Sequence, residues 1–228
     1  MPRLRMRISM SLDGFVAGPN QSVDTPLGEG GEGLHEWAFA LEAWRKPHKL
    51  KGGEVNPSTA VMEESLANIG ATIMGRNMFG GHPGGWETSP PGRSGVPARP
   101  GEGKYLWTGW WGDDPPFHHP VFVLTHHPRP TLELKGGNSF TFVTDGIESA
   151  LRQARQAAGG KDIALAGGAK ACQAYLRAGL VDEMEIHLVP ILLGGGERLF
   201  EGVNDLKGLE PVRTVATREV THLKFARR

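Results

Sequence analysis

An apolar run, a pair of glycines and an amphipathic segment follow one another between residues 162 and 176. In the last part, apolar residues recur at helical spacing and end before Gly179. The order predicts a strand, a tight turn at Gly167-Gly168, and a helix. Glycines at such a junction let the backbone bend sharply, and the free N–H groups of the new helix form a phosphate cradle. The alternative interpretation is a plain turn.

The same alternation of strands and helices recurs along the chain. Further strands are predicted at 5–16 with a break at Asp13-Gly14, and at 71–74, 121–125, 140–144 and 184–193. Further helices are predicted at 34–41, 57–69 and 147–158, and the segments 212–220 and 221–226 predict a closing hairpin. Alternating strands and helices imply a mainly parallel sheet covered on both faces, with an antiparallel end. We therefore predict one α/β domain over residues 1–228.

Two helix starts carry capping signals. Asn56 is a good N-cap and Pro57 sits at the first helical position, where a missing N–H has no consequence. Asp145 and Glu148 have the spacing of a capping box. Both signals predict where their helices begin.

Composition excludes several classes of function. The formal net charge is zero, with 25 Lys and Arg against 25 Asp and Glu, so no nucleic-acid partner is predicted. Cys172 is the single cysteine, which excludes an internal disulfide and a cysteine-based zinc site. The chain has no apolar run of membrane-spanning length. We expect a cytoplasmic protein with no membrane contact.

The stretch from 80 to 120 is dense in Gly, Pro and Trp. A loop of this length within a compact domain is generally functional or disordered, and its four tryptophans argue against disorder. We interpret it as an insertion folded over the body, with a lid or a subunit contact as the two candidate roles.

Three predicted strands end in glycine or polar residues: Gly75-Arg76, Thr125-His126 and Gly167-Gly168. In parallel sheets, ligands bind across the carboxyl ends of the strands. If these ends are neighbours, they supply a guanidinium, a hydroxyl and helix-start donors to a ligand with several phosphates. NADP rather than NAD is the natural candidate, and the alternative for Arg76 is a solvated charge.

Other candidate residues have competing interpretations. Asp13 is a turn residue or a site carboxylate, Glu36 lies on the solvated face of an amphipathic helix or belongs to a site, and Trp37 is a core residue or a substrate platform. The histidine pairs at 118–119 and 126–127 place neighbouring side chains on opposite faces of an extended chain, so we predict no metal site.

The ordered set of motifs resembles the dihydrofolate reductase-like superfamily. Within it, the chain most resembles the C-terminal reductase domain of the bifunctional riboflavin-biosynthesis deaminase/reductase. The motifs are Ser11-Leu12-Asp13-Gly14, Met74-Gly75-Arg76, Val123-Leu124-Thr125, Ala166-Gly167-Gly168-Ala169, and Leu180-Val181-Asp182-Glu183 leading to Val189-Pro190-Ile191-Leu192-Leu193-Gly194. The resemblance runs over almost the whole chain except 80–120.

The resemblance implies a central sheet of about eight strands, NADPH as hydride donor and a homodimer. The residues implied to lie at the 2′-phosphate side of NADPH are Gly75, Arg76, Asn77, Thr125 and His126. Those implied to hold its pyrophosphate are Gly167, Gly168, Ala169 and Lys170. The backbone of Val16 and Ala17 is implied to meet the nicotinamide amide. Arg7 takes the place of a substrate-binding lysine, and Asp13 is the shared acid of the first strand.

The leading hypothesis is an NADPH-dependent reductase of a small heterocyclic substrate, either a pyrimidinone ribosylamine as in riboflavin biosynthesis or a pterin. Asp13 or Glu36 would supply a proton, and Arg7 and Trp37 would contact the substrate. A second hypothesis is a non-catalytic NADP(H)-binding sensor or partner module. A third is a metal-dependent hydrolase that uses the histidine pairs.

Overall fold

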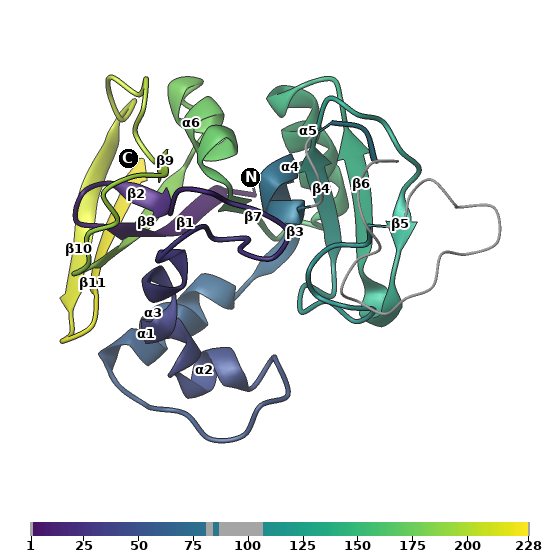
Figure 1. Cartoon of the computed structure of the whole chain (residues 1–228). Coiled ribbons are helices and arrows are strands. Elements are labelled where there is room, and N and C mark those ends of the chain that lie inside the picture. The colour runs from purple at the N-terminus through teal and green to yellow at the C-terminus, as the bar shows by residue number, and fades with distance from the viewer. Residues whose placement is uncertain (1, 81–83, 87–106, 228) are drawn as a thin grey trace.

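The computed structural model describes residues 2–80, 84–86 and 107–227. Its described residues form a nine-stranded sheet in the order β10-β11-β8-β1-β7-β3-β4-β6-β5 (Figure 1). The strands of this sheet are β1 (Leu4–Ser11), β3 (Ile69–Gly75), β4 (Pro120–Leu124), β5 (Leu132–Glu133), β6 (Ser139–Val143), β7 (Asp162–Gly167), β8 (Glu183–Val189), β10 (Leu209–Ala216) and β11 (Thr221–Arg227).

The central strands are parallel, and the C-terminal hairpin is antiparallel. Strand β1 pairs in parallel with β7 and β8, and β3 pairs in parallel with β4 and β7. Strand β11 runs antiparallel to β8 and to β10. The α/β prediction with a mainly parallel sheet and an antiparallel end is confirmed. The nine strands exceed the implied eight because the two-residue β5 extends one edge.

The first predicted strand is wrong beyond Ser11, because the chain turns out of the sheet there. Residues Phe15–Ala17 form β2, which pairs with β9 (Glu197–Arg198) in a separate two-stranded sheet. The Asp13 carboxylate stabilises the turn by accepting hydrogen bonds from the backbone of Leu193 and Gly194, at 3.1 and 2.7 Å.

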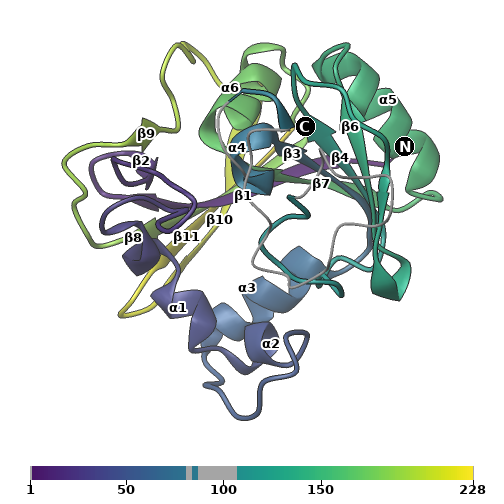
Figure 2. The same ribbon diagram turned by 45° about the vertical axis from the view of Figure 1, so that its right-hand side comes forward.

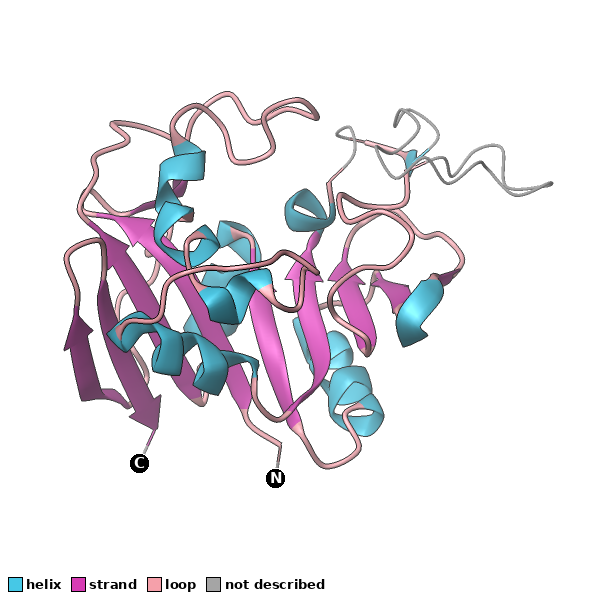
Figure 3. Ribbon diagram, turned by 90° about the horizontal axis from the view of Figure 1, so that it is seen from below, coloured by secondary structure: helices cyan, strands magenta, loops and turns pink. Residues whose placement is uncertain are grey.

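Helices cover both faces of the large sheet. The helical segments are η1 (Gly31–Leu34), α1 (Glu36–Phe39), α2 (Glu42–Arg45), α3 (Pro57–Leu66), α4 (Arg76–Phe79), η3 (Lys135–Gly137), α5 (Ile147–Ala157) and α6 (Ala169–Arg177). Figures 2 and 3 show α1, α2 and α3 on one face, whereas α5 and α6 lie on the other. The single helix predicted at 34–41 is two short pieces, since His35 lies between η1 and α1. Among the described residues, no helix is both long and apolar enough to cross a membrane.

One predicted cap is confirmed and the other is wrong. The Asn56 side chain accepts a hydrogen bond from the Ser58 backbone at 2.9 Å, and the Thr59 hydroxyl accepts one from the Asn56 backbone at 3.0 Å. Helix α5 instead begins after Gly146, whose φ of 99° places Asp145 outside the cap.

We expect Asn56→Ala to lower the free energy of unfolding by about 1 kcal/mol, because the variant loses the cap of α3. Urea unfolding would measure it. Asn204 is exposed, so Asn204→Ala is the matched control and should shift the value by less than about 0.5 kcal/mol. Equal losses in the two variants would contradict a specific role for the cap.

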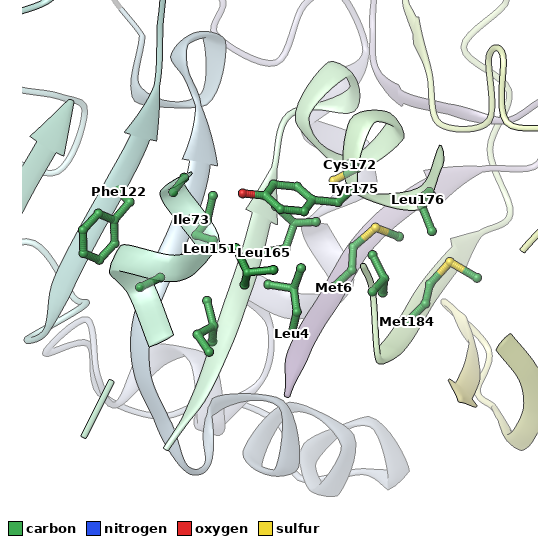
Figure 4. Packing of buried hydrophobic residues seen from close by; sticks show 14 of the residues in the cluster. Leu4, Met6, Ile73, Phe122, Leu151, Leu165, Cys172, Tyr175, Leu176 and Met184 are labelled. Atoms are coloured by element: carbon green, nitrogen blue, oxygen red, sulfur yellow. The ribbon is translucent and has the colours of Figure 1, made fainter. Parts of the chain in front are cut away.

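The main apolar core lies between the sheet and helices α5 and α6. Figure 4 shows Tyr175 and Leu176 of α6 among Leu4, Met6 and Leu165 of the strands. The Tyr175 hydroxyl donates to the Ile147 carbonyl at 2.7 Å, which connects α6 to the start of α5. Burial raises the pKa of Cys172 to about 12, so this cysteine is an apolar core residue rather than a reactive thiol.

A second layer of apolar packing lies at the β4–β6 side and includes part of the Trp-rich stretch. Trp86 and Trp107 are fully buried there with Phe79 and Phe140. The Trp107 indole donates to the Phe79 carbonyl at 2.9 Å. The described parts of the stretch thus contribute core, while its roles as a lid or a subunit contact stay predictions. Residues 81–83 and 87–106 lie outside the described residues.

The sheet face under α3 is unusually polar. Glu183 is buried between Arg3, Arg5 and Lys224, at 3.2, 3.0 and 3.1 Å. Glu185 pairs with Arg213 at 2.9 Å on the same face. Alternate residues of β1, β8 and β11 therefore carry charges on one side and core residues on the other.

Candidate functional site

The three strand ends that carry glycine or polar residues are neighbours in the sheet. The order β7-β3-β4 places them side by side, with Met74 opposite Gly167 and Gly75 opposite Leu124. Thr125 follows Leu124 directly. The condition on which the predicted phosphate site depended is therefore met.

The glycines at these ends leave room for a ligand close to the backbone. Gly168 precedes α6, and a Cβ placed on it would meet nothing within 4 Å. A Cβ on Gly75 would instead meet the Ala171 side chain at 3.3 Å and the Gly168 nitrogen at 3.5 Å, so this glycine lets β3 pack closely against the start of α6. The helix-start amides of Ala169 and Lys170 therefore begin beside open space, and this arrangement fits the pyrophosphate of a dinucleotide.

Arg76 lies at the first position of α4, on the ring of Trp86. Its guanidinium carbon is 3.5 Å from the ring centroid, and the guanidinium of Arg129 lies 5.0 Å from the same ring. Burial, and then the charge of Arg129, lower the pKa of Arg76 to about 10, so the side chain is still charged at neutral pH. Stacking of this kind holds a guanidinium plane in place.

The other predicted cofactor residues surround these three ends with different degrees of exposure. The Thr125 hydroxyl is buried and accepts a hydrogen bond from the His127 backbone at 3.1 Å. Asn77, His126 and Lys170 are exposed. Their assignment to the cofactor stays a prediction, because no contact in the structure tests it.

Val16 and Ala17 lie on β2, beside the end of β1. Both are buried, and Val16 belongs to the main core. A Cβ on Gly196 would lie 2.0 Å from the Ala17 carbonyl oxygen, so β9 packs directly against this backbone. A role in holding the nicotinamide amide stays a prediction.

Asp13 occupies the turn after β1 as a fully hydrogen-bonded carboxylate. The Ser11 hydroxyl donates to it at 2.6 Å, in addition to the two backbone donors of residues 193 and 194. The Ser11 hydrogen bond is the largest cause that lowers the pKa of Asp13 to about 2; burial opposes it, and the backbone donors of Gly194 and Leu193 lower the pKa further. An ionised acceptor with these partners suits the turn interpretation better than a proton donor, and the catalytic role stays a prediction.

A cavity of about 250 Å³ lies at the carboxyl end of β8, two strands away from the glycine pair of β7. Its lining residues are Gly33, Glu36, Trp37, Ala40, Glu54, Asn56, Ser58, Val189, Pro190, Ile191, Thr217, Glu219 and Val220. Two predicted residues, Glu36 and Trp37, thus meet in one place. Neighbouring strands are about 4.8 Å apart, so strands β8 and β7, with β1 between them, lie about 10 Å apart in the sheet.

Arg7 is not among the lining residues of this cavity. It lies on the polar face of β1, and its Nη1 atom is buried with no hydrogen-bond partner among the described residues. Burial is the main cause that lowers the pKa of Arg7 to about 10, followed by the charge of Arg5. Contact of Arg7 with a substrate stays a prediction.

The histidine pairs do not converge on one point. His119 exchanges a hydrogen bond of 2.7 Å with Thr72, whereas His118 lies 3.0 Å from the Gly136 carbonyl. Within the described residues, no group of three His, Cys, Asp or Glu side chains could hold a metal ion. The geometry gives the hydrolase hypothesis no support.

Four residues near the candidate site were not predicted from the sequence. Arg129 follows the end of β4 by five positions, and its position as a cation after a strand was the available signal. Ser58, His187 and His222 carried no signal, because β8, β11 and α3 bring them together only in the folded chain.

Comparisons with known proteins agree with this architecture. The family model of the RibD C-terminal domain matches residues 2–226. The uncharacterized protein YyaP of Bacillus subtilis (strain 168) is 29% identical over 106 residues, which are 45% of this chain and 56% of that protein. The match thus spans little more than half the length of this relative.

Two solved structures share the fold. A protein from Shewanella sp. PV-4 that carries a riboflavin-biosynthesis name is 19% identical, with a TM-score of 0.55 and 99% of each chain covered. The Thermotoga maritima diaminohydroxyphosphoribosylaminopyrimidine deaminase/5-amino-6-(5-phosphoribosylamino)uracil reductase is 13% identical, with a TM-score of 0.54. That match covers 100% of this chain and 57% of the Thermotoga chain.

Proposed function

Since the chain belongs to the family of the RibD C-terminal domain, we propose that it is an NADPH-dependent reductase of a small heterocyclic substrate. Membership confirms the resemblance drawn from the motifs and supports an oxidoreductase. The observation that carries the cofactor assignment is the adjacency of Gly75-Arg76, Thr125 and Gly167-Gly168 at three neighbouring strand ends. The names of the two solved relatives make a pyrimidinone ribosylamine one candidate substrate, and a pterin is the other candidate.

The residues of the chain would mainly bind and position. The helix-start amides after Gly168 would hold the pyrophosphate, and Arg76 on its Trp86 support would pair with the 2′-phosphate. When bound, the reduced nicotinamide supplies a hydride. The substrate would lie in the cavity beside Trp37, with Glu36 at its rim as the candidate proton donor. We propose a cytoplasmic homodimer as the working assembly.

A non-catalytic NADP(H)-binding module is the second candidate. The Asp13 carboxylate is held in the turn by hydrogen bonds from the backbone of Leu193 and Gly194, and Glu36 is exposed, so neither is a clear proton donor. Consumption of NADPH in the presence of a pterin or a pyrimidinone separates the two candidates. Turnover supports the reductase, whereas binding of NADPH without turnover across both substrate classes supports the module.

We expect Arg76→Ala to raise the dissociation constant for NADPH about 10- to 100-fold, since one charge-assisted contact with the 2′-phosphate is lost. The dissociation constant for NADH should stay nearly unchanged, because NADH has no such phosphate. Titration with each cofactor, followed by energy transfer from tryptophan to the reduced nicotinamide, would measure both constants.

Arg155→Ala is the matched control for this substitution. Arg155 is an exposed arginine of α5, away from the three strand ends, so its removal changes the net charge equally. Both dissociation constants should remain within about twofold of the parent values. An equal loss of NADPH and NADH affinity in Arg76→Ala would refute the assigned role.

A further inference from the structure

Three buried polar side chains, linked to one another by hydrogen bonds, extend from the cavity beside Trp37 into the protein. Ser58 lines the cavity, and its hydroxyl lies 2.9 Å from Nε2 of His222. Nδ1 of His222 lies 2.8 Å from Nδ1 of His187. Ser58, His222 and His187 are buried, at 2%, 1% and 5% exposure, so these three side chains reach solvent through the cavity rather than at the protein surface.

Both imidazoles are neutral at ordinary pH. Burial is the first cause that keeps the pKa of His187 well below its usual range, and burial also lowers the pKa of His222 to about 4. The indole of Trp37 packs against both rings, tilted to His187 and edge-on to His222, with centroids 4.7 and 5.0 Å away. A neutral imidazole has one N–H and one bare nitrogen, so the Nδ1 to Nδ1 contact contains a single hydrogen.

The position of that hydrogen decides what Ser58 presents to the cavity. If His222 donates at Nδ1, its Nε2 is bare and accepts the Ser58 hydroxyl hydrogen, so Ser58 offers lone pairs to a ligand. If His187 donates, His222 carries its hydrogen at Nε2 and donates to Ser58. The hydroxyl hydrogen of Ser58 is then free to point into the cavity.

The charge of Arg7 favours the second arrangement. Nδ1 of His187 contacts His222 of β11, and the residue of β1 opposite His187 is Ser9. Arg7 lies two residues before Ser9 on the same face, opposite Glu185, and its charge is a cause of the low pKa of His187 after burial and His222. The cation stabilises a lone pair directed toward it and therefore favours bare Nε2 and protonated Nδ1 in His187. Ser58 is thus set as a hydrogen-bond donor.

The rim of the cavity defines the charge of the ligand. Glu36, Glu54 and Glu219 are exposed there, and the lining formed by described residues contains no lysine or arginine. Trp37, Val189 and Val220 supply apolar walls. Three carboxylates repel a phosphate, while the walls accept an uncharged ring.

We propose that Ser58, oriented by the His222–His187 pair, donates a hydrogen bond to a carbonyl oxygen or ring nitrogen of an uncharged heterocycle that carries no phosphate. The inference rests on the proposed function in one respect, since it takes this cavity to be the substrate site of the reductase. Ser58 is a specificity residue of that site, and the two histidines are positioning residues.

Calorimetric titration of the whole protein with pterin, with ribose 5-phosphate and with inorganic phosphate tests the ligand class. We expect saturable binding of pterin and an affinity about 5- to 10-fold lower in Ser58→Ala, the loss of one hydrogen bond between uncharged groups. Ser65→Ala is the matched control, since Ser65 is buried on the same helix but bonds the Val61 carbonyl outside the cavity. Equal pterin affinity in Ser58→Ala and Ser65→Ala, no binding of pterin to the parent protein, or displacement of pterin by ribose 5-phosphate or by inorganic phosphate would overturn the proposal.

Nitrogen NMR of the unsubstituted protein tests the Ser58–His222–His187 hydrogen bonds independently of any variant. The expected tautomers are His187 with hydrogen at Nδ1 and His222 with hydrogen at Nε2, and the reverse pair would overturn the assigned polarity. Titration with NADPH separates this inference from the proposed function. Loss of NADPH binding with pterin binding intact would refute the reductase and leave the Ser58 assignment standing, whereas intact NADPH binding with Ser58-independent pterin binding would refute the Ser58 assignment alone.

Discussion

Replacing Glu183 by alanine is expected to lower the free energy of unfolding by about 3–5 kcal/mol, the range for breaking a buried ion pair. The carboxylate is buried and lies within 3.2 Å of a nitrogen of Arg3, Arg5 and Lys224. Its removal takes from the mostly buried cations of Arg5 and Lys224 their shared partner and leaves them Asp162 and Glu64, respectively, as the remaining carboxylates. Chemical denaturation at neutral pH would measure the loss.

Glu201→Ala is the control for this experiment. Glu201 is exposed, so its removal should change the free energy of unfolding by less than about 0.5 kcal/mol. If the two variants lose the same stability, the buried network contributes no more than surface charge does. If Glu183→Ala is more stable than the parent, desolvation of the charges outweighs their mutual attraction.

The second large effect concerns cofactor binding. We expect Gly168→Val to raise the dissociation constant for NADPH by about 100-fold or more, since its methyl groups would fill the space beside the helix-start amides and remove two or more charge-assisted contacts. A Cβ at residue 168 meets no protein atom within 4 Å, and φ of −75° suits any residue. The protein itself should therefore tolerate the side chain, and the melting temperature should change little.

Ala178→Val controls for the added side chain. Ala178 is exposed at the far end of α6, so the substitution enlarges the same helix away from the glycine pair. Its NADPH affinity should match that of the parent protein. Unchanged NADPH affinity in Gly168→Val would show that the cofactor phosphates lie elsewhere.

Local signals and one topological rule were sufficient to predict that the three strand ends lie side by side, and the binding of phosphate there stays a prediction. The glycine pair and the Gly75-Arg76 step are readable because a turn at a strand end needs small residues, and parallel strands bring their carboxyl ends to one edge. The sequence does not show that Trp86 supports Arg76, since a ring ten residues away becomes a neighbour only through the packing of the second core.

Long-range partners account for the elements that sequence reasoning missed. The chain leaves the sheet after Ser11 because Asp13 meets the backbone of Leu193, 180 positions further on, and no local pattern encodes that contact. Ser58, His187 and His222 are equally separate in sequence. Their meeting depends on the register that sets His222 opposite His187 and on the docking of α3 above both.

The place of β1 in the sheet also has a consequence for how the chain folds. This strand comes before the other described strands in the chain, yet its neighbours are β7 and β8, and the register pairs Leu4 with Ile163 and Arg5 with Glu183. Pairing β1 with β7 and β8 closes long loops, which is slow relative to the pairing of strands that are close in sequence. The middle strands β3, β4 and β6 can associate with α5 before β1 pairs with β7 and β8. We therefore expect the edge of β7 that faces β1 to become ordered later than its other edge, where Gly167 lies opposite Met74 of β3.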